Sequence, residues 1–508
     1  MLREHGGVTS TPRRRLAVAG ALTGVAGLVV ADLATNVLHA RATPVQAVAE
    51  AVIAITPGPV AEALIHLVGR NDKPILVAGV TVALVLLGAW AGLLTARRRL
   101  LGQLVFWVMG AIALAAVVTR PGFTPYSLLP LAAGVLAWTL LLDFLTTRAE
   151  PRPSLPESRR RFLLAAGGVA VGAVVVGAAG ELVGRARRGV DAARARLDLP
   201  VSRGVVPAGA GSDLSGLTPW RVPNADFYRI DTAIVLPAVD PADWRLRIHG
   251  MVEKEITLTY QDLLDRELTE DWLTICCVSN PVGGDLIGNA WWSGVRVADL
   301  LKEAGVDPRA DAVKQTSKDG WTCGTPIQAL TDDRNALLAV AMNGEPLPVE
   351  HGFPVRMVVP GLYGYVSATK WVVDLEVTRY DRFQAYWTQN GWSAKGPVKT
   401  ESRVEVPRNG TDVKAGSVRV GGQAWAQHTG IERVEFRLDG DDWRPAQLGR
   451  VPGNDTWVQW AGAVDVDSGS HTLTVRATDR SGYTQTPARV DVVPDGATGW
   501  HRVEFNAG

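Results

Sequence analysis

The sequence L-T-I-C-C-V-S-N at residues 273–280, read together with M-N-G-E-P-L-P-V-E-H-G-F-P-V-R at residues 342–356, decides how the second half of this chain is interpreted. The first stretch places cysteines at the end of a predicted strand, and a thiolate is a ligand for soft or redox-active metals. The second predicts a loop in which prolines stiffen a set of cationic donors. Together they indicate a metal held by sulfur inside a phosphate-bearing cofactor, and therefore a redox enzyme.

The two adjacent cysteines cannot both serve a metal. Successive side chains of a strand point to opposite faces, so only one of Cys276 and Cys277 can face a pocket, and we expect Cys277 to be the ligand. Asn280 follows it, and Pro281–Gly284 predicts a turn that lets a bulky cofactor approach. The alternative is a pair of buried cysteines that pack as small hydrophobic side chains.

The cationic loop suits a phosphate. Arg356 can bind a phosphate through two parallel hydrogen bonds, Lys370 adds a point charge, and the backbone amides of residues 367–369 can add donors. A surface loop with solvated charges is the alternative interpretation. The neighbouring apolar run Met357–Pro360 predicts partial burial, and buried cations need anionic partners.

Length and composition bound the function. A chain of 508 residues predicts two or three domains. The net charge is +1, with 52 Lys and Arg against 51 Asp and Glu, so a nucleic-acid partner has no electrostatic support and we expect none. Only 3 cysteines are present, and they cannot form a disulfide framework.

The first part of the chain is predicted to lie in a membrane. Several runs are long and apolar enough to cross a bilayer, which takes about 20 residues. We expect five spans, at Leu16–Val37, Pro74–Thr95, Leu100–Thr119, Tyr126–Leu145 and Phe162–Val183. Another apolar stretch, Pro44–Gly69, is broken by Pro57-Gly58-Pro59, so it predicts an interfacial or re-entrant pair of helices.

Arginine clusters predict the orientation of these spans. Arg13–Arg15, Arg97–Arg99 and Arg159–Arg161 all fall on one side of a five-span protein, and clusters of this kind lie in the cytoplasm. Everything after Val183 then lies outside. The predicted location is the cell membrane, as a multi-pass protein with an extracytoplasmic catalytic domain. The helices are expected to serve as an anchor in the lipid bilayer or as a docking surface for a partner.

The remainder of the chain predicts a linker and two domains. Residues 1–183 form the transmembrane region, and residues 184–220 are basic and then rich in Gly, Pro and Ser, as in a linker. Residues 221–400 mix strands (244–250 and 272–278) with helices (259–264 and 297–304). Residues 401–508 alternate apolar and polar side chains between turn signals, which predicts an immunoglobulin-like all-β sandwich.

From about Trp220 to its end, the chain resembles the sulfite oxidase family of molybdopterin enzymes, in a membrane-anchored bacterial form. The motifs that carry the resemblance are Cys277-x-x-Asn280, Trp292–Val295, Met342–Pro348, His351–Arg356 and Lys370-Trp371. The final domain, which ends in W-H-R-V at residues 500–503, resembles the dimerisation domain of that family. The implied fold is multi-domain: transmembrane helices, an α+β sulfite-oxidase-like molybdopterin domain, and an immunoglobulin-like sandwich.

The resemblance implies a cofactor and a set of site residues. It implies Mo-molybdopterin, with a single molybdenum bound by a pterin dithiolene and by Cys277, and a two-electron transfer of an oxygen atom. The implied cofactor-binding residues are Tyr228, Arg229, Asn280, Ser317, Asp319, His351, Arg356, Ser367, Thr369 and Lys370. The implied catalytic residues are Cys277, Arg229 and Tyr386.

The chain departs from the family beside the ligand cysteine. Enzymes that oxidise sulfite carry arginines there, whereas this sequence has Pro281 and Val282. Arg229 is the candidate left for binding an oxyanion, and Tyr386 is the candidate active-site tyrosine. The predicted substrate is therefore a small sulfur- or nitrogen-containing molecule rather than sulfite in particular. The expected partners are an unidentified electron-transfer protein and a second copy of the chain.

The start of the last apolar run bears on export. S-R-R-R-F-L at residues 158–163 resembles the twin-arginine signal of a route that carries folded proteins, and an ordinary basic anchor is the alternative. A pterin cofactor inserted in the cytoplasm favours export of a folded domain.

Two other classes of protein compete with the enzyme. One is a membrane-tethered binding or scaffold protein built on a catalytically decayed molybdoenzyme fold. The other is a transporter, which the scarcity of charge within the predicted spans argues against.

Overall fold

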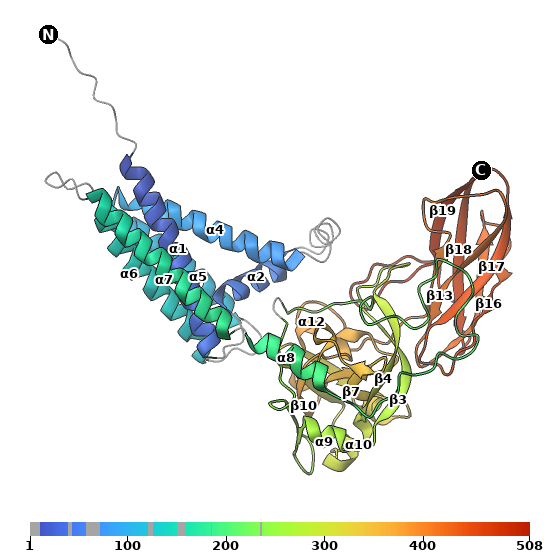
Figure 1. The fold of residues 1–508 in the computed structure, drawn as a ribbon. Coiled ribbons are helices and arrows are strands. Elements are labelled where there is room, and N and C mark those ends of the chain that lie inside the picture. Colours follow the sequence, from blue (N-terminus) through green and yellow to red (C-terminus); the bar gives the residue numbers. More distant parts are fainter. Residues whose placement is uncertain are drawn as a thin grey trace, which may run out of the picture. The chain divides into compact units, whose positions relative to one another are not determined.

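The computed structural model divides into a helical unit and a mostly β unit (Figure 1). The helical unit contains residues 1–189 with 232–236, and the β unit contains residues 190–231 with 237–508. The structure describes residues 11–38, 43–56, 72–119, 125–149, 158–183, 185–233 and 236–508.

Backbone-to-backbone packing of small residues holds the helical unit together. Its helices are α1 (Thr11–Val37), α2 (Pro44–Ile55), α4 (Asp72–Thr95), α5 (Arg99–Thr119), α6 (Leu128–Ala149) and α7 (Ser158–Val183), with the 3-10 turn η2 (Pro125–Ser127). A Cβ atom on Gly92 of α4 would lie 2.0 Å from the carbonyl oxygen of Leu16 on α1. The indole of Trp138 on α6 donates to the carbonyl of Gly24, at 3.0 Å. Close approach at small residues is how helices associate in lipid, where apolar side chains gain little from leaving it.

Hydropathy along these helices confirms four of the expected spans as candidates. Within the described residues, four helical stretches are long and apolar enough to cross a membrane: Arg13–Thr35, Ile75–Thr95, Arg99–Thr119 and Pro125–Ala149. The fifth predicted span, Phe162–Val183, is not confirmed. It lies on α7, where the apolar stretch among the described residues is the shorter Phe162–Val174.

The interrupted apolar stretch Pro44–Gly69 is described in its first part only. Pro44–Ile55 forms α2, whose N-terminus is capped by Thr43, and residues 57–69 lie outside the described residues. The apolar part of α2, Pro44–Ile53, is shorter than a membrane span, as the prediction of an interfacial or re-entrant helix requires.

The predicted linker is more ordered than its composition indicates. Residues 185–196 form a helix, α8, and the Arg194 guanidinium donates to the carbonyl oxygen of Leu347, at 2.8 Å. Further on, Ser212 donates its amide hydrogen to the Gln459 side chain, at 2.6 Å, and Thr218 donates to Glu405, at 2.8 Å. These contacts attach the segment to both β-rich domains. They join residues far apart in the sequence, so the composition of the segment does not predict them.

The first β-rich domain is α+β, as expected, and contains two sheets. One has the strand order β2-β1-β10-β5-β6, and the other has β3-β4-β7-β8, with β9 added beside β7. The strands are β1 (Arg245–Gly250), β2 (Ile256–Thr259), β3 (Thr269–Cys276), β4 (Ile287–Arg296), β5 (Ala312–Ser317), β6 (Thr322–Pro326), β7 (Leu337–Met342), β8 (Glu345–Pro346), β9 (Arg356–Val358) and β10 (Val372–Thr378). Its helices and 3-10 turns are α9 (Tyr260–Leu264), α10 (Val297–Ala304), α11 (Gln328–Thr331), α12 (Tyr386–Gln389), η3 (Val349–His351), η4 (Gly364–Val366) and η5 (Tyr380–Arg382). The two predicted helices and both predicted strands are confirmed, and β3 ends one residue before Cys277.

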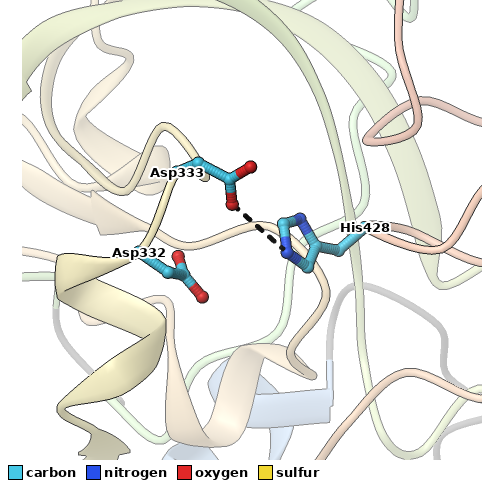
Figure 2. A group of neighbouring side chains, drawn as sticks. All are labelled: Asp332, Asp333 and His428. Atoms are coloured by element: carbon cyan, nitrogen blue, oxygen red, sulfur yellow. Dashed lines mark ion pairs between the residues drawn. The ribbon is translucent and has the colours of Figure 1, made fainter.

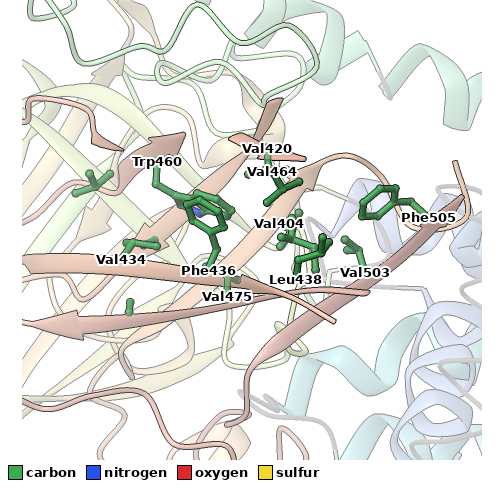
Figure 3. Packing of buried hydrophobic residues seen from close by; sticks show 14 of the residues in the cluster. Val404, Val420, Val434, Phe436, Leu438, Trp460, Val464, Val475, Val503 and Phe505 are labelled. Atoms are coloured by element: carbon green, nitrogen blue, oxygen red, sulfur yellow. The ribbon is translucent and has the colours of Figure 1, made fainter. Parts of the chain in front are cut away.

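The second β-rich domain is the predicted sandwich. Its sheets have the strand orders β11-β13-β17-β16 and β12-β19-β18-β14-β15. The strands are β11 (Glu401–Val406), β12 (Asp412–Val413), β13 (Gly416–Trp425), β14 (Ile431–Leu438), β15 (Arg444–Pro445), β16 (Gln447–Leu448), β17 (Val458–Val466), β18 (Gly469–Asp479) and β19 (His501–Ala507). Buried side chains from the two sheets meet in one core, where the rings of Phe436 and Trp460 stack at 5.8 Å (Figure 3). Alternation along β14 and β18 places these apolar residues inside, as predicted.

The strand that leads to the cysteines is bonded to the sandwich domain. Thr274 on β3 donates its amide hydrogen to the carbonyl oxygen of Asp455, at 2.8 Å, and its hydroxyl accepts from the Trp457 amide, at 2.9 Å. Glu401 is buried near Cys276, and burial raises the pKa of its carboxyl group to about 8. The junction between the two β-rich domains therefore lies directly behind the cysteines.

The buried carboxyl group predicts a pH-dependent stability. Unfolded glutamate ionises near about pH 4.3, whereas folded Glu401 keeps its proton to about pH 8. The folded state then binds more protons, so stability is lost as pH rises from about 4.3 to 8. We expect Glu401→Gln to raise the free energy of unfolding at pH 8–9 by no more than about 5 kcal/mol, and the thermal midpoint with it, and to do little near pH 4. Thermal unfolding of the full-length protein in detergent at both pH values is the measurement, with exposed Glu504→Gln as control. Equal midpoints of Glu401→Gln and wild type at pH 9 would contradict it.

Candidate active site

Cys277 lies at the start of a closed loop between β3 and β4. Its amide donates to the carbonyl oxygen of Leu286, at 2.9 Å, and its carbonyl accepts from the Asn280 amide, at 3.1 Å. The Asn280 side-chain oxygen accepts from the Leu286 amide, at 2.9 Å. The Cys277 side chain is buried, with 8% of the residue exposed. The loop thus presents one thiol from a fixed backbone position.

The two adjacent thiols lie in different surroundings. Burial raises the pKa of Cys277, whereas hydrogen bonds from Ser279 and the charge of Lys370 lower it. Burial also raises the pKa of Cys276, and Glu401 raises it further, with Arg403 acting in the opposite direction. Cys277 therefore faces the groups that favour a thiolate, and Cys276 faces the junction with the sandwich domain.

Two cations converge close to Cys277. Arg356 has only 3% of its surface exposed, donates to the carbonyl oxygen of His351 at 3.1 Å, and lies 5.1 Å from the Trp292 ring. Gly352, with φ +112°, allows this convergence, because a Cβ atom there would lie 3.0 Å from Arg356 Cβ and 3.1 Å from Lys370 Cα. The side chain of Lys370 is 10% exposed.

These cations carry more positive charge than the described carboxylates offset. Lys370 forms an ion pair with Asp231 at 3.2 Å, and no described carboxylate pairs with Arg356. Burial lowers the pKa of Lys370 to about 8 and that of Arg356 to about 10. Burial also lowers the pKa of His351 to about 3, with Lys370 and Arg356 as the next causes. An anion bound here would relieve this repulsion and the cost of burial.

Three of the predicted cofactor-binding residues have buried polar atoms without a partner among the described residues. Asn280 Nδ2, Ser317 Oγ and His351 Nδ1 are buried, and none has a hydrogen-bond partner within the described chain. Buried polar groups are almost always paired in native proteins. An anionic, polar cofactor would therefore satisfy both the charges and these donors, so the residues present fit a phosphate-bearing group.

The hydroxyl groups of Ser367 and Thr369, two predicted cofactor-binding residues, form contacts within the protein. Ser367 Oγ donates to the carbonyl oxygen of Tyr363, at 3.0 Å, and Thr369 Oγ1 lies 3.3 Å from Cys323 Sγ. Both residues are buried. Their segment nevertheless lies beside the site, because it runs directly into Lys370.

Asp319 has a structural contact of its own. Its carboxylate accepts from the Trp321 amide, at 3.1 Å, in the turn between β5 and β6. The preceding residue of that turn, Lys318, donates its amide hydrogen to the carbonyl oxygen of Trp371, at 2.9 Å. The turn that holds Ser317 and Asp319 is thereby attached to the segment that holds Lys370.

The remaining predicted residues lie at different depths. Tyr228 is close to both cysteines. Burial raises the pKa of its hydroxyl group, the charges of Cys277 and Cys276 raise it further, and Arg356 acts in the opposite direction. Arg229 lies at the rim, with a side chain 44% exposed and an ion pair to Asp231 at 3.1 Å. Tyr386 begins α12, where its amide donates to Thr322 Oγ1 at 3.3 Å.

Two further residues contribute to the site and were not predicted from the sequence. Asp231 pairs with both Lys370 and Arg229, although it belongs to no motif. Ser279, within the quoted motif, acts to lower the pKa of the Cys277 thiol. A hydroxyl placed just after a ligand cysteine is a signal that could have identified Ser279, whereas Asp231 meets Lys370 only through the fold.

A second cluster of metal-ligating groups involves the sandwich domain. Asp332, Asp333 and His428 bring their ligand atoms within 4.8 Å of one another, and His428 Nε2 lies 4.0 Å from Asp333 Oδ1 (Figure 2). Both carboxylate oxygens of Asp332 accept hydrogen bonds from Arg334, and the Asp333 side chain is 95% exposed. The cluster offers no sulfur, so Cys277 is the site suited to a soft metal.

Family models match both β-rich domains. A model for the oxidoreductase molybdopterin binding domain matches residues 233–387, and one for a bacterial Ig domain matches residues 402–475. The first match contains Cys277 and the cationic loop, and the second covers most of the sandwich.

Several characterised and uncharacterised proteins are similar to the chain. It is 34% identical over 189 residues to the uncharacterized oxidoreductase YuiH of Bacillus subtilis, which covers 36% of this chain and 90% of that protein. It is 29% identical over 335 residues to the sulfite oxidase of Gallus gallus, covering 56% and 72%. Among solved structures, the sulfane dehydrogenase SoxCD of Paracoccus pantotrophus is similar at 26% identity and a TM-score of 0.46, covering 52% and 74%. The chain belongs to the sulfite oxidase family of molybdopterin-dependent oxidoreductases and is a molybdenum-dependent enzyme with a molybdopterin cofactor.

Proposed function

We propose that this protein is a membrane-anchored molybdopterin enzyme that transfers an oxygen atom to or from a small sulfur- or nitrogen-containing substrate. The observation that carries the proposal is the convergence of one buried thiol, two buried cations and three unpaired polar atoms in a single site. When bound, the cofactor supplies two-electron exchange of an oxygen atom. Oxidation of a substrate then takes one oxygen from water and releases two protons, and an unidentified partner protein accepts the two electrons. Reduction of a sulfoxide or an N-oxide is the reverse: the partner supplies two electrons, two protons are taken up, and the oxygen leaves as water.

The residues of the chain divide this task among them. Cys277 is the metal ligand, and Ser279 and Lys370 stabilise its thiolate against the cost of burial. Arg356 and Lys370 bind the phosphate of the cofactor. The side chains of Asn280, Ser317 and His351 supply further hydrogen bonds from Nδ2, Oγ and Nδ1.

The substrate approaches beside Pro281 and Val282, which add no charge. Arg229 is then the cation at the rim, and it is largely exposed and paired with Asp231. Attraction between solvated charges is only about 1 kcal/mol at contact distance in water, and salt weakens it. A strongly charged oxyanion therefore gains little here, so we propose neutral or weakly charged substrates such as sulfoxides and N-oxides, with Tyr386 as the active-site tyrosine.

Membrane location and export complete the proposal. Four candidate spans anchor the protein, and the 26-residue α7 is about 39 Å long at 1.5 Å per residue, which exceeds the bilayer core. With α7 as a fifth crossing, the catalytic domain lies outside the cytoplasm. The twin-arginine-like start of α7 supports export of that domain already folded around its cofactor, and the sandwich supports assembly as a homodimer.

The orientation gives a test in intact cells. We expect protease added to spheroplasts to remove a tag placed after Gly508 and to leave an N-terminal tag until the cells are lysed, because five crossings put the two ends on opposite sides. Immunoblotting for the two tags is the measurement. Protection of the C-terminal tag in intact spheroplasts would contradict an extracytoplasmic catalytic domain.

Removal of the ligand thiol tests the proposed chemistry. The full-length protein should contain close to one molybdenum and one pterin per chain and reduce a dye with a substrate from a panel of sulfite, sulfoxides and N-oxides, assayed in both directions. We expect Cys277→Ser to lower that activity at least about a hundredfold, since even groups that only support a metal ligand are worth about 10–100-fold. Cys276→Ser is the matched control and should retain activity. A metal-free wild-type protein that still binds a partner through residues 401–508 would instead favour the scaffold interpretation.

Removal of a buried cation separates cofactor binding from stability. We expect Arg356→Met to lower the molybdenum and pterin content at least about tenfold, because a bidentate charged hydrogen bond contributes about 1.5–3 kcal/mol. The same change removes a buried charge with no described carboxylate partner, so the cofactor-free variant should be as stable as the wild type or more stable. Elemental analysis and thermal unfolding check the two effects, with partly exposed Arg379→Met as control. Full molybdenum content in Arg356→Met would sink the phosphate role.

A further inference from the structure

The loop that carries Cys277 is held from outside its own domain. We call residues 277–286 the cysteine loop. Its later part contains Gly283 and Gly284, and the carbonyl oxygen of Gly284 accepts a hydrogen bond from Arg403 Nη1, at 2.5 Å. Arg403 belongs to β11, the first strand of the sandwich domain. A side chain of one domain thus bonds the loop that presents the thiol of the other.

Hydrogen bonds and aromatic rings hold the side chain of Arg403 in place. It is buried, and its Nε donates to Glu405 Oε1, at 2.8 Å. Glu405 accepts from the amide and the hydroxyl of Thr218, at 2.8 and 2.7 Å. The Arg403 guanidinium lies 5.9 Å from the Trp425 ring and 5.8 Å from the Trp457 ring. Charged hydrogen bonds in such surroundings are strong and directional.

A second contact from the same strand reaches the loop. The amide of Val404, next to Arg403, donates to His501 Nδ1, at 3.0 Å. The His501 ring packs against Gly283, where a Cβ atom would lie 2.1 Å from Nε2. Gly283 has φ +82°, a backbone conformation that residues with a side chain rarely adopt. The loop is therefore clamped at two consecutive residues.

The contacts from Arg403 and His501 hold a loop that borders the thiol and the proposed path of the substrate. Cys277 begins it, and Pro281 and Val282, beside which the substrate is proposed to approach, lie between the thiol and the clamp. Another arginine of the sandwich, Arg437, also lies over two aromatic rings, but these belong to Trp443 and Trp500. Two arginines of one domain therefore differ in whether they bond the loop.

We propose that Arg403 is a positioning residue of the active site, which fixes the cysteine loop through the carbonyl of Gly284 and so sets the orientation of the Cys277 thiol and the shape of the approach over Pro281 and Val282. This role rests on the proposed function of Cys277. It makes the sandwich domain part of the catalytic apparatus, in addition to its proposed part in dimerisation.

The test uses the full-length protein in detergent, purified from cells unable to make the cofactor. Each cysteine is followed by its rate of reaction with iodoacetamide, with the modified peptides identified by mass spectrometry. We expect Arg403→Gln to speed alkylation of Cys277 at least about tenfold, because it removes a charged hydrogen bond that closes the loop. Arg437→Gln, the matched control, should leave the rate at the wild-type value.

Cys323 reports on the fold in the same experiment, because it is buried and bonded to Thr369. Arg403→Lys guards against a variant that merely unfolds. Lysine keeps a charge for Glu405 but lacks the planar fork that reaches Glu405 and Gly284 together. We expect Arg403→Lys to expose Cys277 while Cys323 stays protected. Wild-type protection of Cys277 in Arg403→Lys, or equal exposure of Cys323, overturns the proposal.

Kinetics of the loaded enzyme supply an independent readout. We expect Arg403→Lys to raise KM for the substrate and to lower kcat, with cofactor content unchanged, because the approach and the thiol are both displaced. If Cys277→Ser keeps full activity, the proposed function fails while the alkylation result still reports on the loop. If Cys277→Ser is inactive and Arg403→Lys matches the wild type in both experiments, the positioning role alone fails.

Discussion

Uncompensated positive charge in a buried site is the constraint on which the active site depends. Arg356 and Lys370 are withdrawn from water, and Asp231 is the carboxylate that pairs with Lys370. A protein keeps such an arrangement only where something pays for the burial, and an anionic ligand does so while also pairing with the nearby donors. Burial raises the pKa of Cys277, and the charge of Lys370 acts in the opposite direction together with Ser279, so a cation proposed to bind the phosphate also favours the thiolate.

The strand before Cys277 couples this site to the rest of the β unit. Thr274 exchanges hydrogen bonds with the sandwich domain through Asp455 and Trp457, and the indoles of Trp220 and Trp457 each donate to the other residue's carbonyl oxygen, at 3.2 and 2.9 Å. Arg403 extends this connection past the end of the strand. A site held from two domains keeps its geometry only while both are folded and joined. The segment 185–220 is bonded to both, through Arg194 to Leu347 and through Ser212 to Gln459.

Features that depend on residues close together in the sequence could be predicted from the sequence. The strand that ends just before Cys277 follows from its apolar run, and the burial of Arg356 follows from the apolar residues beside it. Contacts between distant segments lay beyond such reasoning. The engagement of the Thr369 hydroxyl depends on where β6 brings Cys323, and composition alone assigned α8 to a linker because its bonds to Leu347 come from the fold. The fifth predicted span was likewise placed from its apolar run alone, whereas the packing of Phe162 on α7 against Leu16 and Leu145 comes from the fold.

Strand register decides which of the two adjacent cysteines can serve a metal. Pleating sends Cys276 and Cys277 to opposite sides, so a slip of one residue between β3 and β4 would exchange their surroundings. The pairing of Cys276 with Ile287 fixes the register at one end, and the Trp292 indole, which donates to the carbonyl oxygen of Leu273 at 3.1 Å, fixes it further along. Trp292 also faces the guanidinium of Arg356. One side chain therefore aligns the strand that presents the thiol and flanks the cation that would hold the cofactor, which ties the two ends of the site to a single register.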